Sequence, residues 1–193
     1  MELLQKRIRE DGVVLPGNIL KVDSFLNHQI DVSLLNKIGE EFARRFAGIP
    51  VTKILTIEAS GIGVACITAQ YFNVPVVFAK KVKSKNIGTD LFHCEVRSFT
   101  KDTVYPVTVS KMYLSAEDSV LIIDDFLAEG SALDALIRLV READARVAGA
   151  GIVIEKGFQK GGDRIRSQGV RLESLAVIDR MSPEEGIVFR DDA

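Results

Sequence analysis

The segment from residue 120 to residue 132, VLIIDDFLAEGSA, constrains the fold of this chain more than any other. Four aliphatic residues lead into two adjacent acids, Asp124 and Asp125, and a short loop containing Gly130 then runs into a helical pattern. A continuous aliphatic run of this kind is typical of a strand buried in a parallel sheet. The acids therefore fall near the carboxyl end of a strand, which is where open α/β sheets bind ligands.

A regular alternation of strand and helix patterns extends this interpretation to most of the chain. Strand patterns cover residues 53–57, 74–79, 120–124 and 147–154, and helix patterns fill residues 60–72 and the segment after residue 130. Because strands joined through helices pair in parallel, the sequence predicts an α/β fold with a doubly wound, mainly parallel sheet flanked by helices. A late edge strand is expected at residues 172–178.

The chain before the first of these strands has a different character. Residues 2–10 fit a short amphipathic helix with Leu3 on its apolar side. Residues 13–27 are rich in turn residues, which predicts short strands or an ordered loop. Asp31 is suited to cap a helix that runs to about residue 46.

Residues 80–115 interrupt the alternation. This segment opens with four lysines, at positions 80, 81, 83 and 85, and then gives short β-type runs near residues 92–99 and 104–109. We expect a long mobile loop that leads into an antiparallel ribbon. Long loops in compact domains are usually lids or disordered segments, so a lid is expected at about residues 82–105.

Length and composition define the class of protein. At 193 residues, the chain is long enough for one α/β domain, and we expect residues 1–193 to form it. A formal net charge of −2 argues against a broad nucleic-acid surface. Cys66 and Cys94 have no metal-type spacing, and Cys66 lies among small apolar residues where a buried position is expected.

The same features predict where the protein works. No apolar run approaches the ~20 residues that span a membrane, and the N-terminus lacks the apolar core of a signal peptide. A chain with only two cysteines suits a reducing compartment. We therefore expect a cytoplasmic protein with neither a nucleic-acid nor a membrane partner.

The acid pair and the loop that follows it indicate a ligand with both hydroxyl and phosphate groups. Ionised carboxylates such as those of Asp124 and Asp125 only accept hydrogen bonds, which suits sugar hydroxyls. Backbone N–H groups at the start of a helix favour an anion. A ribose 5-phosphate carries both kinds of group. The plainer alternative is a surface turn in which these acids cap the next helix.

Residues 120–132 resemble the phosphoribosyl-diphosphate (PRPP) signature of the type I phosphoribosyltransferases. Residues 58–62, EASGI, follow a strand and resemble the pyrophosphate loop of that superfamily. Residues 12–30 and 151–159 resemble the bacterial xanthine phosphoribosyltransferases in particular. The resemblance covers nearly the whole chain. It implies transfer of the 5-phosphoribosyl group of PRPP to N9 of xanthine, which gives xanthosine 5′-monophosphate and pyrophosphate in purine salvage.

For PRPP, the resemblance implies that Asp124 and Asp125 bind the ribose hydroxyls and that the next loop cradles the 5′-phosphate. The loop residues are Ala128, Glu129, Gly130, Ser131 and Ala132. Many members carry threonine in place of Glu129 and Ala132, so this loop relies on its backbone N–H groups and on the Ser131 hydroxyl. Related hypoxanthine–guanine enzymes carry an acid, a proposed catalytic base, where this chain has Ala128, and no catalytic base is assigned here.

For pyrophosphate, the resemblance implies Ala59, Ser60 and Gly61, through consecutive amides and the serine hydroxyl, together with Lys81. The alternative for the loop is a plain N-cap of the following helix. The alternative for Lys81 is a lysine on a solvated face, since runs of like charge are usually exposed.

For the base, the resemblance implies Leu20, Asn27 and Lys156. Lys156 follows a buried strand and can donate to an exocyclic purine oxygen, whereas Asn27 can both donate and accept. Leu20 would supply an apolar wall or its backbone groups. The alternatives are a surface lysine, a turn asparagine and a core leucine.

The resemblance also implies Mg²⁺, held mainly by PRPP and pyrophosphate rather than by a metal site of the protein, and no organic cofactor. It implies a homodimer and a small hood over the active site, built from about residues 12–30 and the chain after residue 154. Two further functions stay open at this point. One is a guanine or hypoxanthine phosphoribosyltransferase, and the other is a non-catalytic purine-sensing regulator with the same fold.

Overall fold

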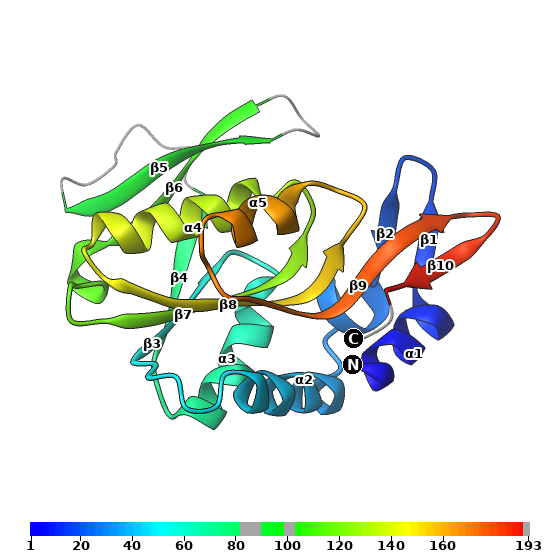
Figure 1. The fold of residues 1–193 in the computed structure, drawn as a ribbon, viewed down its shortest axis with the longest axis horizontal. Coiled ribbons are helices and arrows are strands. Elements are labelled where there is room, and N and C mark those ends of the chain that lie inside the picture. The colour runs from blue at the N-terminus through cyan, green and yellow to red at the C-terminus, as the bar shows by residue number, and fades with distance from the viewer. Residues whose placement is uncertain (82–89, 99–102, 191–193) are drawn as a thin grey trace.

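A central sheet with helices on both faces organises the molecule (Figure 1). The computed structural model describes residues 1–81, 90–98 and 103–190. Within these ranges, eight strands form the sheet in the order β10-β9-β8-β7-β3-β4-β6-β5. Their bounds are β3 (Lys53–Ile57), β4 (Val76–Lys81), β5 (Leu91–Ser98), β6 (Thr103–Ser110), β7 (Ser119–Leu127), β8 (Arg146–Lys156), β9 (Leu172–Ser182) and β10 (Gly186–Phe189).

The centre of the sheet is parallel and its edges are antiparallel. The run β9-β8-β7-β3-β4 pairs in parallel throughout. β10 is antiparallel to β9 at one edge, and β6 is antiparallel to both β4 and β5 at the other. The predicted doubly wound, mainly parallel α/β fold is therefore confirmed.

Helices cover the two faces in pairs. α2 (Val32–Arg45) and α3 (Gly61–Phe72) lie on one face, and α4 (Ser131–Glu142) and α5 (Gly161–Ser167) lie on the other (Figure 1). The predicted cap of α2 is present, because the Leu34 N–H donates to the Asp31 carboxylate at 3.1 Å. No helix in the described ranges is long and apolar enough to cross a membrane.

Alternating side chains of the central strands feed two hydrophobic cores. On β7, Leu121 and Ile123 belong to the core shared with α2 and α3. Val120 and Ile122 belong to the core shared with α4 and the β5–β6 ribbon. A strand that is buried on both faces needs an unbroken aliphatic run, which explains the pattern that begins at residue 120.

The N-terminal segment forms a separate small layer beside β9 and β10 (Figure 1). It contains α1 (Glu2–Asp11), the hairpin β1 (Val13–Leu15) and β2 (Ile19–Lys21), and a π-helical turn (Asp23–Asn27). The short strands predicted for this region are therefore confirmed. Leu4 and Ile8 anchor α1 in the core. Leu3 is half exposed, so the prediction that it lies on the apolar side of this helix is wrong.

The interruption at residues 80–115 forms the predicted antiparallel ribbon. β5 and β6 pair along their whole length, and a 3₁₀ turn (Lys111–Tyr113) follows β6. The predicted lid, at about residues 82–105, includes residues 82–89 and 99–102, which lie outside the described residues.

Three other sequence predictions are corrected. The strand predicted at residues 172–178 is longer than expected, because β9 continues to Ser182, and β10 pairs with its outer side only from Ile178 to Ser182. β7 continues past the predicted end at residue 124, and Phe126 and Leu127 still pair with β8. Cys66 is exposed rather than buried, because it lies on the outer side of α3.

Candidate active site

The carboxyl ends of four parallel strands lie at one edge of the sheet and carry the predicted site residues. β3 leads through residues 58–60 into α3, and β7 leads through residues 128–130 into α4. β4 ends at Lys81 and β8 ends at Lys156. Because the order β8-β7-β3-β4 is continuous and parallel, all four ends share one edge, the usual ligand position in such sheets.

The two acids of β7 differ sharply in environment. Asp124 is 4% exposed, whereas Asp125 is half-buried. The Asp125 N–H donates to Asp124 Oδ1 at 3.0 Å. Burial, reinforced by the adjacent Asp125 charge, raises the pKa of Asp124 well above its ordinary value, and Lys81 acts in the opposite direction. Asp124 is thus a buried carboxyl whose charge depends on nearby cations.

The first turn of α3 packs directly on this acid. A Cβ on Gly61 would overlap Thr56 Oγ1 and would lie 2.7 Å from Asp124 Oδ1. Any side chain at Gly61 would therefore displace the carboxylate. Thr56 is fully buried, and its hydroxyl finds no hydrogen-bond partner within the described part of the chain. The sequence prediction missed Thr56, although a hydroxyl inside the otherwise aliphatic end of β3 was a visible signal.

The loop between β3 and α3 is tied to the end of β4. Glu58 Oε1 accepts a hydrogen bond from the Lys81 N–H at 2.5 Å, and the Glu58–Ala59 peptide bond is cis. Ser60 precedes α3, and its side chain makes no capping hydrogen bond. The predicted alternative of a plain serine N-cap is therefore wrong, and the hydroxyl is left for another partner.

Lys81 and Tyr105 bring positive charge and a phenol toward the acids. Lys81 Nζ lies 5.9 Å from the centre of the Tyr105 ring. Burial raises the pKa of Tyr105, and the Asp124 charge raises it further, so the phenol stays protonated. Tyr105 belongs to β6, and no local pattern in the sequence pointed to it. Of the other predicted lysines, Lys83 and Lys85 lie outside the described residues.

The five predicted phosphate-loop residues form one compact turn at the start of α4. Gly130 has φ +78°, a conformation that favours glycine. The Asp134 N–H donates to the Gly130 carbonyl at 2.9 Å and begins the helix. Glu129, Ser131 and Ala132 are all half-buried. The backbone N–H groups at this helix start suit an anion.

Lys156, at the end of β8, lies at the other end of this sheet edge from Lys81, at the end of β4. Its Nζ donates to the Asn18 carbonyl, in the β1–β2 turn, at 2.8 Å, and lies 5.9 Å from the centre of the Phe126 ring. Burial lowers the pKa of Lys156. The alternative of a plain surface lysine is therefore wrong, because Lys156 joins β8 to the N-terminal hairpin.

Leu20 and Asn27, the other two residues predicted to bind the base, differ in exposure. Leu20 is 7% exposed and packs in the core, as its plainer alternative expected. Asn27 is exposed at the end of the π-helical turn. The next residues bring this segment toward α3, since a Cβ on Gly63 would lie 2.9 Å from Ile30 Cδ1. Asn27 thus lies on a segment that approaches the first turn of α3.

Comparisons with known proteins agree with this geometry. The phosphoribosyl transferase domain model matches residues 21–174. A xanthine phosphoribosyltransferase of Lachnoclostridium phytofermentans is 61% identical over 193 residues, covering 100% of both chains. One of Clostridium novyi is 63% identical over 191 residues, covering 99% of this chain and 100% of its own. The chain belongs to the phosphoribosyl transferase family.

Solved structures show the same type I phosphoribosyltransferase fold. An adenine phosphoribosyltransferase of Trypanosoma brucei, in complex with AMP, pyrophosphate and ribose-5-phosphate, has a TM-score of 0.75 at 21% identity, covering 90% of this chain and 78% of its own. One of Rhodothermus marinus has a TM-score of 0.74 at 21% identity, covering 92% and 99%. At this identity the likeness concerns the fold alone.

Proposed function

We propose that the chain transfers the 5-phosphoribosyl group of PRPP to N9 of xanthine, giving xanthosine 5′-monophosphate and pyrophosphate in purine salvage. The family match and relatives that are about 60% identical over the full length support this function. The observation that carries it is the buried acid Asp124 packed on Gly61, between the two anion-type loops of one sheet edge. Such an edge suits a sugar that bears a phosphate at one end and a diphosphate at the other.

We propose a role for each site residue that is compatible with its position on this edge. Asp124 and Asp125 accept hydrogen bonds from the ribose hydroxyls. The loop of Ala128, Glu129, Gly130, Ser131 and Ala132 holds the 5′-phosphate through backbone N–H groups. Ala59, Ser60, Gly61 and Lys81 hold the pyrophosphate. Lys156 donates to an oxygen of xanthine, with Asn27 and Leu20 along the base.

Catalysis would then come mainly from positioning and electrostatics. Anchoring the two phosphate groups at separate loops holds the ribose carbon between base and leaving group. When the bond to pyrophosphate breaks, positive charge develops on the ribose and negative charge on the leaving group. The Lys81 ammonium is suited to the negative charge, and the Asp124 carboxylate is suited to the positive charge nearby.

Mg²⁺ fits the donor groups of this site. Mg²⁺ takes oxygen ligands and is usually held by one or two carboxylates together with substrate phosphates. Asp124 and Asp125 provide carboxylate oxygens, and PRPP would provide most of the remaining ligands. Mg²⁺ held there would supply positive charge that favours departure of the diphosphate.

Pyrophosphate release tests this function. Purified protein with PRPP and Mg²⁺ should release pyrophosphate fastest with xanthine in a panel that includes guanine, hypoxanthine, adenine and uracil. Faster turnover of guanine or hypoxanthine would reassign the base. Comparable rates with uracil would refute a purine substrate, and binding of purines without release of pyrophosphate would favour a regulator.

We also propose that the protein is a homodimer that pairs through α3 and the adjoining edge of the sheet. α3 carries no charged residue between Gly61 and Phe72, although Cys66 and Tyr71 are exposed. A solvent-facing helix normally has a charged face. An uncharged outer face of this kind is typical of a surface that another chain covers.

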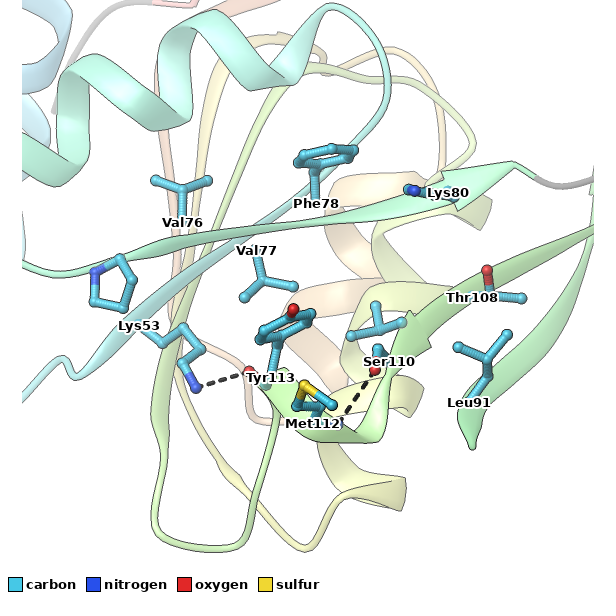
Figure 2. A pocket seen from close by; sticks show the side chains of 12 residues that line it. Lys53, Val76, Val77, Phe78, Lys80, Leu91, Thr108, Ser110, Met112 and Tyr113 are labelled. Carbon is cyan, nitrogen blue, oxygen red and sulfur yellow. Dashed lines mark hydrogen bonds between the residues drawn. The ribbon is translucent and has the colours of Figure 1, made fainter. Parts of the chain in front are cut away.

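An apolar groove lies along β4, at the same edge of the sheet (Figure 2). The groove has a volume of about 590 Å³ and is lined by Phe78 of β4 and by Met112 and Tyr113 of the 3₁₀ turn. Phe78 is 41% exposed, Met112 76% and Tyr113 56%. With Tyr71, these side chains expose roughly 400 Å² of surface, at about 200 Å² per full side chain. That is about half of the ~800 Å² that each partner buries in a standard interface.

Sedimentation equilibrium tests the dimer. The wild-type protein should sediment as a dimer, and Phe78→Glu combined with Met112→Glu should sediment as a folded monomer. Val104→Glu, at an exposed apolar position on the ribbon, is the matched control and should stay dimeric. A monomeric wild type, or a double variant that remains dimeric, would rule out this face.

We further propose that residues 1–193 form one phosphoribosyltransferase domain whose hood is built from about residues 12–30 and the chain after residue 154. The hydrogen bond from Lys156 to Asn18 supports this arrangement, because it joins the two parts of the hood. The two free cysteines suit the cytoplasm.

A further inference from the structure

A buried carboxylate lies at the end of β8, next to Lys156 but on the opposite face of the strand. Glu155 is 2% exposed. Its two oxygens accept hydrogen bonds from Arg166 Nη1 and Nη2, both at 2.8 Å, and a further one from the Ser174 hydroxyl. Burial alone would raise the pKa of Glu155, but the bonds from Arg166 and Ser174 outweigh it and lower the pKa below its ordinary value. The group is therefore ionised and fully partnered.

These contacts fix α5 on the sheet. Arg166 lies in the last turn of α5, and Gly162 lies in its first turn. A Cβ on Gly162 would overlap Glu155 Oε1 and would lie 2.5 Å from Arg166 Nη1. The carboxylate therefore packs against the helix backbone as well as its arginine, which sets both the height and the rotation of α5.

The first residue of α5 in turn supports the phosphate loop. The Gly161 N–H donates to the Ala128 carbonyl at 3.2 Å. A Cβ on Gly161 would overlap that carbonyl and would lie 2.8 Å from the Gly130 nitrogen. From the other side, a Cβ on Gly130 would lie 3.1 Å from Gly161 Cα. Two backbone segments thus touch with no side chain between them, so a shift of α5 moves the loop.

We propose that Glu155 is a positioning residue for the phosphate loop: through Arg166 and Gly162 it holds α5, whose Gly161 supports Ala128 and Gly130. This inference rests on the proposed function, since it assigns the loop to the 5′-phosphate. Glu155 does not touch the substrate. It acts on the PRPP end of the reaction although its chain neighbour, Lys156, serves the base end.

The separation between the PRPP end and the base end allows a test that distinguishes a positioning role from a purely structural one. Glu155→Gln keeps the side-chain shape but removes the charge from the Arg166 pair. Arg166→Lys keeps the charge but loses the two-pronged geometry. Each variant should raise the KM for PRPP about tenfold, because small displacements of anchoring groups are costly. The KM for xanthine should stay within about twofold of wild type.

The matched control is Asp118→Asn. Asp118 is also a partly buried carboxylate with a lowered pKa; burial opposes that shift, and hydrogen bonds from Lys53, Ser115 and Thr52 produce it. It lies just before β7, at the opposite end of that strand from the phosphate loop. This variant should lower the melting temperature and leave both KM values unchanged.

Three results would overturn the inference: an unchanged KM for PRPP in the Glu155 and Arg166 variants, equal changes in both KM values, or the same pattern in the control. If one variant does not fold, the other decides. Calorimetric titration with ribose 5-phosphate separates this inference from the proposed function. A wild type that binds this ligand but releases no pyrophosphate would refute the enzyme, and the variants' affinity would still decide the role of Glu155.

Discussion

The PRPP end and the base end of the site are built in different ways. The PRPP end consists of the loops that follow β3 and β7, and close contacts at Gly61 and Gly130 leave no room for a side chain at either position. The base end gathers Leu20, Asn27 and Lys156 from three separate segments, and one lysine hydrogen bond joins the strand to the hairpin. The first is a rigid cradle, and the second depends on how two layers dock.

The largest effect is expected from the acid pair. Asp124→Asn combined with Asp125→Asn should lower kcat/KM for PRPP by about 10²–10³, because the ribose hydroxyls and the reaction charge lose their partners. The KM for xanthine should change little. Asp11→Asn, at an exposed acid of α1, serves as control and should have wild-type kinetics. If xanthine binding weakens as much as PRPP binding, the two ends are not separate.

The next largest effect concerns Lys156. Lys156→Met should lower kcat/KM for xanthine by about 30-fold, since a hydrogen bond to a charged group contributes about 2 kcal/mol. The KM for PRPP should be preserved. Lys160→Met, at an exposed lysine four residues further on, is the matched control. Equal effects of the two variants would remove Lys156 from the base site.

Gly61 and Gly63 lie in the same helix, but the side chains next to them differ in flexibility. Gly61→Ala should cost about 2 kcal/mol and weaken PRPP use, because the new methyl group meets Thr56 and Asp124. The methyl group of Gly63→Ala would crowd only the flexible end of Ile30, at 2.9 Å, and would make an ordinary contact with Leu35, so the free energy of unfolding should change much less. Urea denaturation measures both. Similar losses of stability in the two variants would show that the residues around Gly61 adjust to a methyl group as readily as Ile30 does.

The smallest effect is the pH dependence of stability. Because the pKa of Asp124 is raised by burial and then by Asp125, the native state holds a proton that the unfolded chain has lost above about pH 4. The free energy of unfolding of the ligand-free protein should therefore fall as the pH rises from about 4 to the raised pKa of Asp124. Asp124→Asn should flatten that fall. A steeper fall in the variant would contradict the assignment.

The sequence predicted the cradle better than the hood, and the reason is physical. A buried strand, an acid pair and a helix start are encoded within residues 120–132, so local rules suffice. The partners of that cradle are not local. Tyr105 reaches the acids from the ribbon, and Gly161 reaches the phosphate loop from α5. Their roles follow from tertiary packing that leaves no spacing pattern.

The errors have the same origin. Cys66 lies among small apolar residues, which are typical of a core, yet it is exposed; because α3 carries no charged residue, its sequence does not distinguish the outer side from the buried one. The strand predicted at residues 172–178 ends too early, because the part of β9 that pairs with β10 continues to Ser182. In each case the sequence shows the local pattern but does not show whether another segment of the chain covers it.

The hydrogen bond from Lys156 to Asn18 has a thermodynamic consequence for ligand entry. This lysine already donates to a backbone carbonyl of the hairpin turn. The ammonium has three N–H donors, so a base oxygen can accept one of them while the Asn18 carbonyl keeps another. Occupancy of the base site would thereby link the base to the β1–β2 turn through one side chain, and amide hydrogen exchange at residues 17–19 should slow when the base binds.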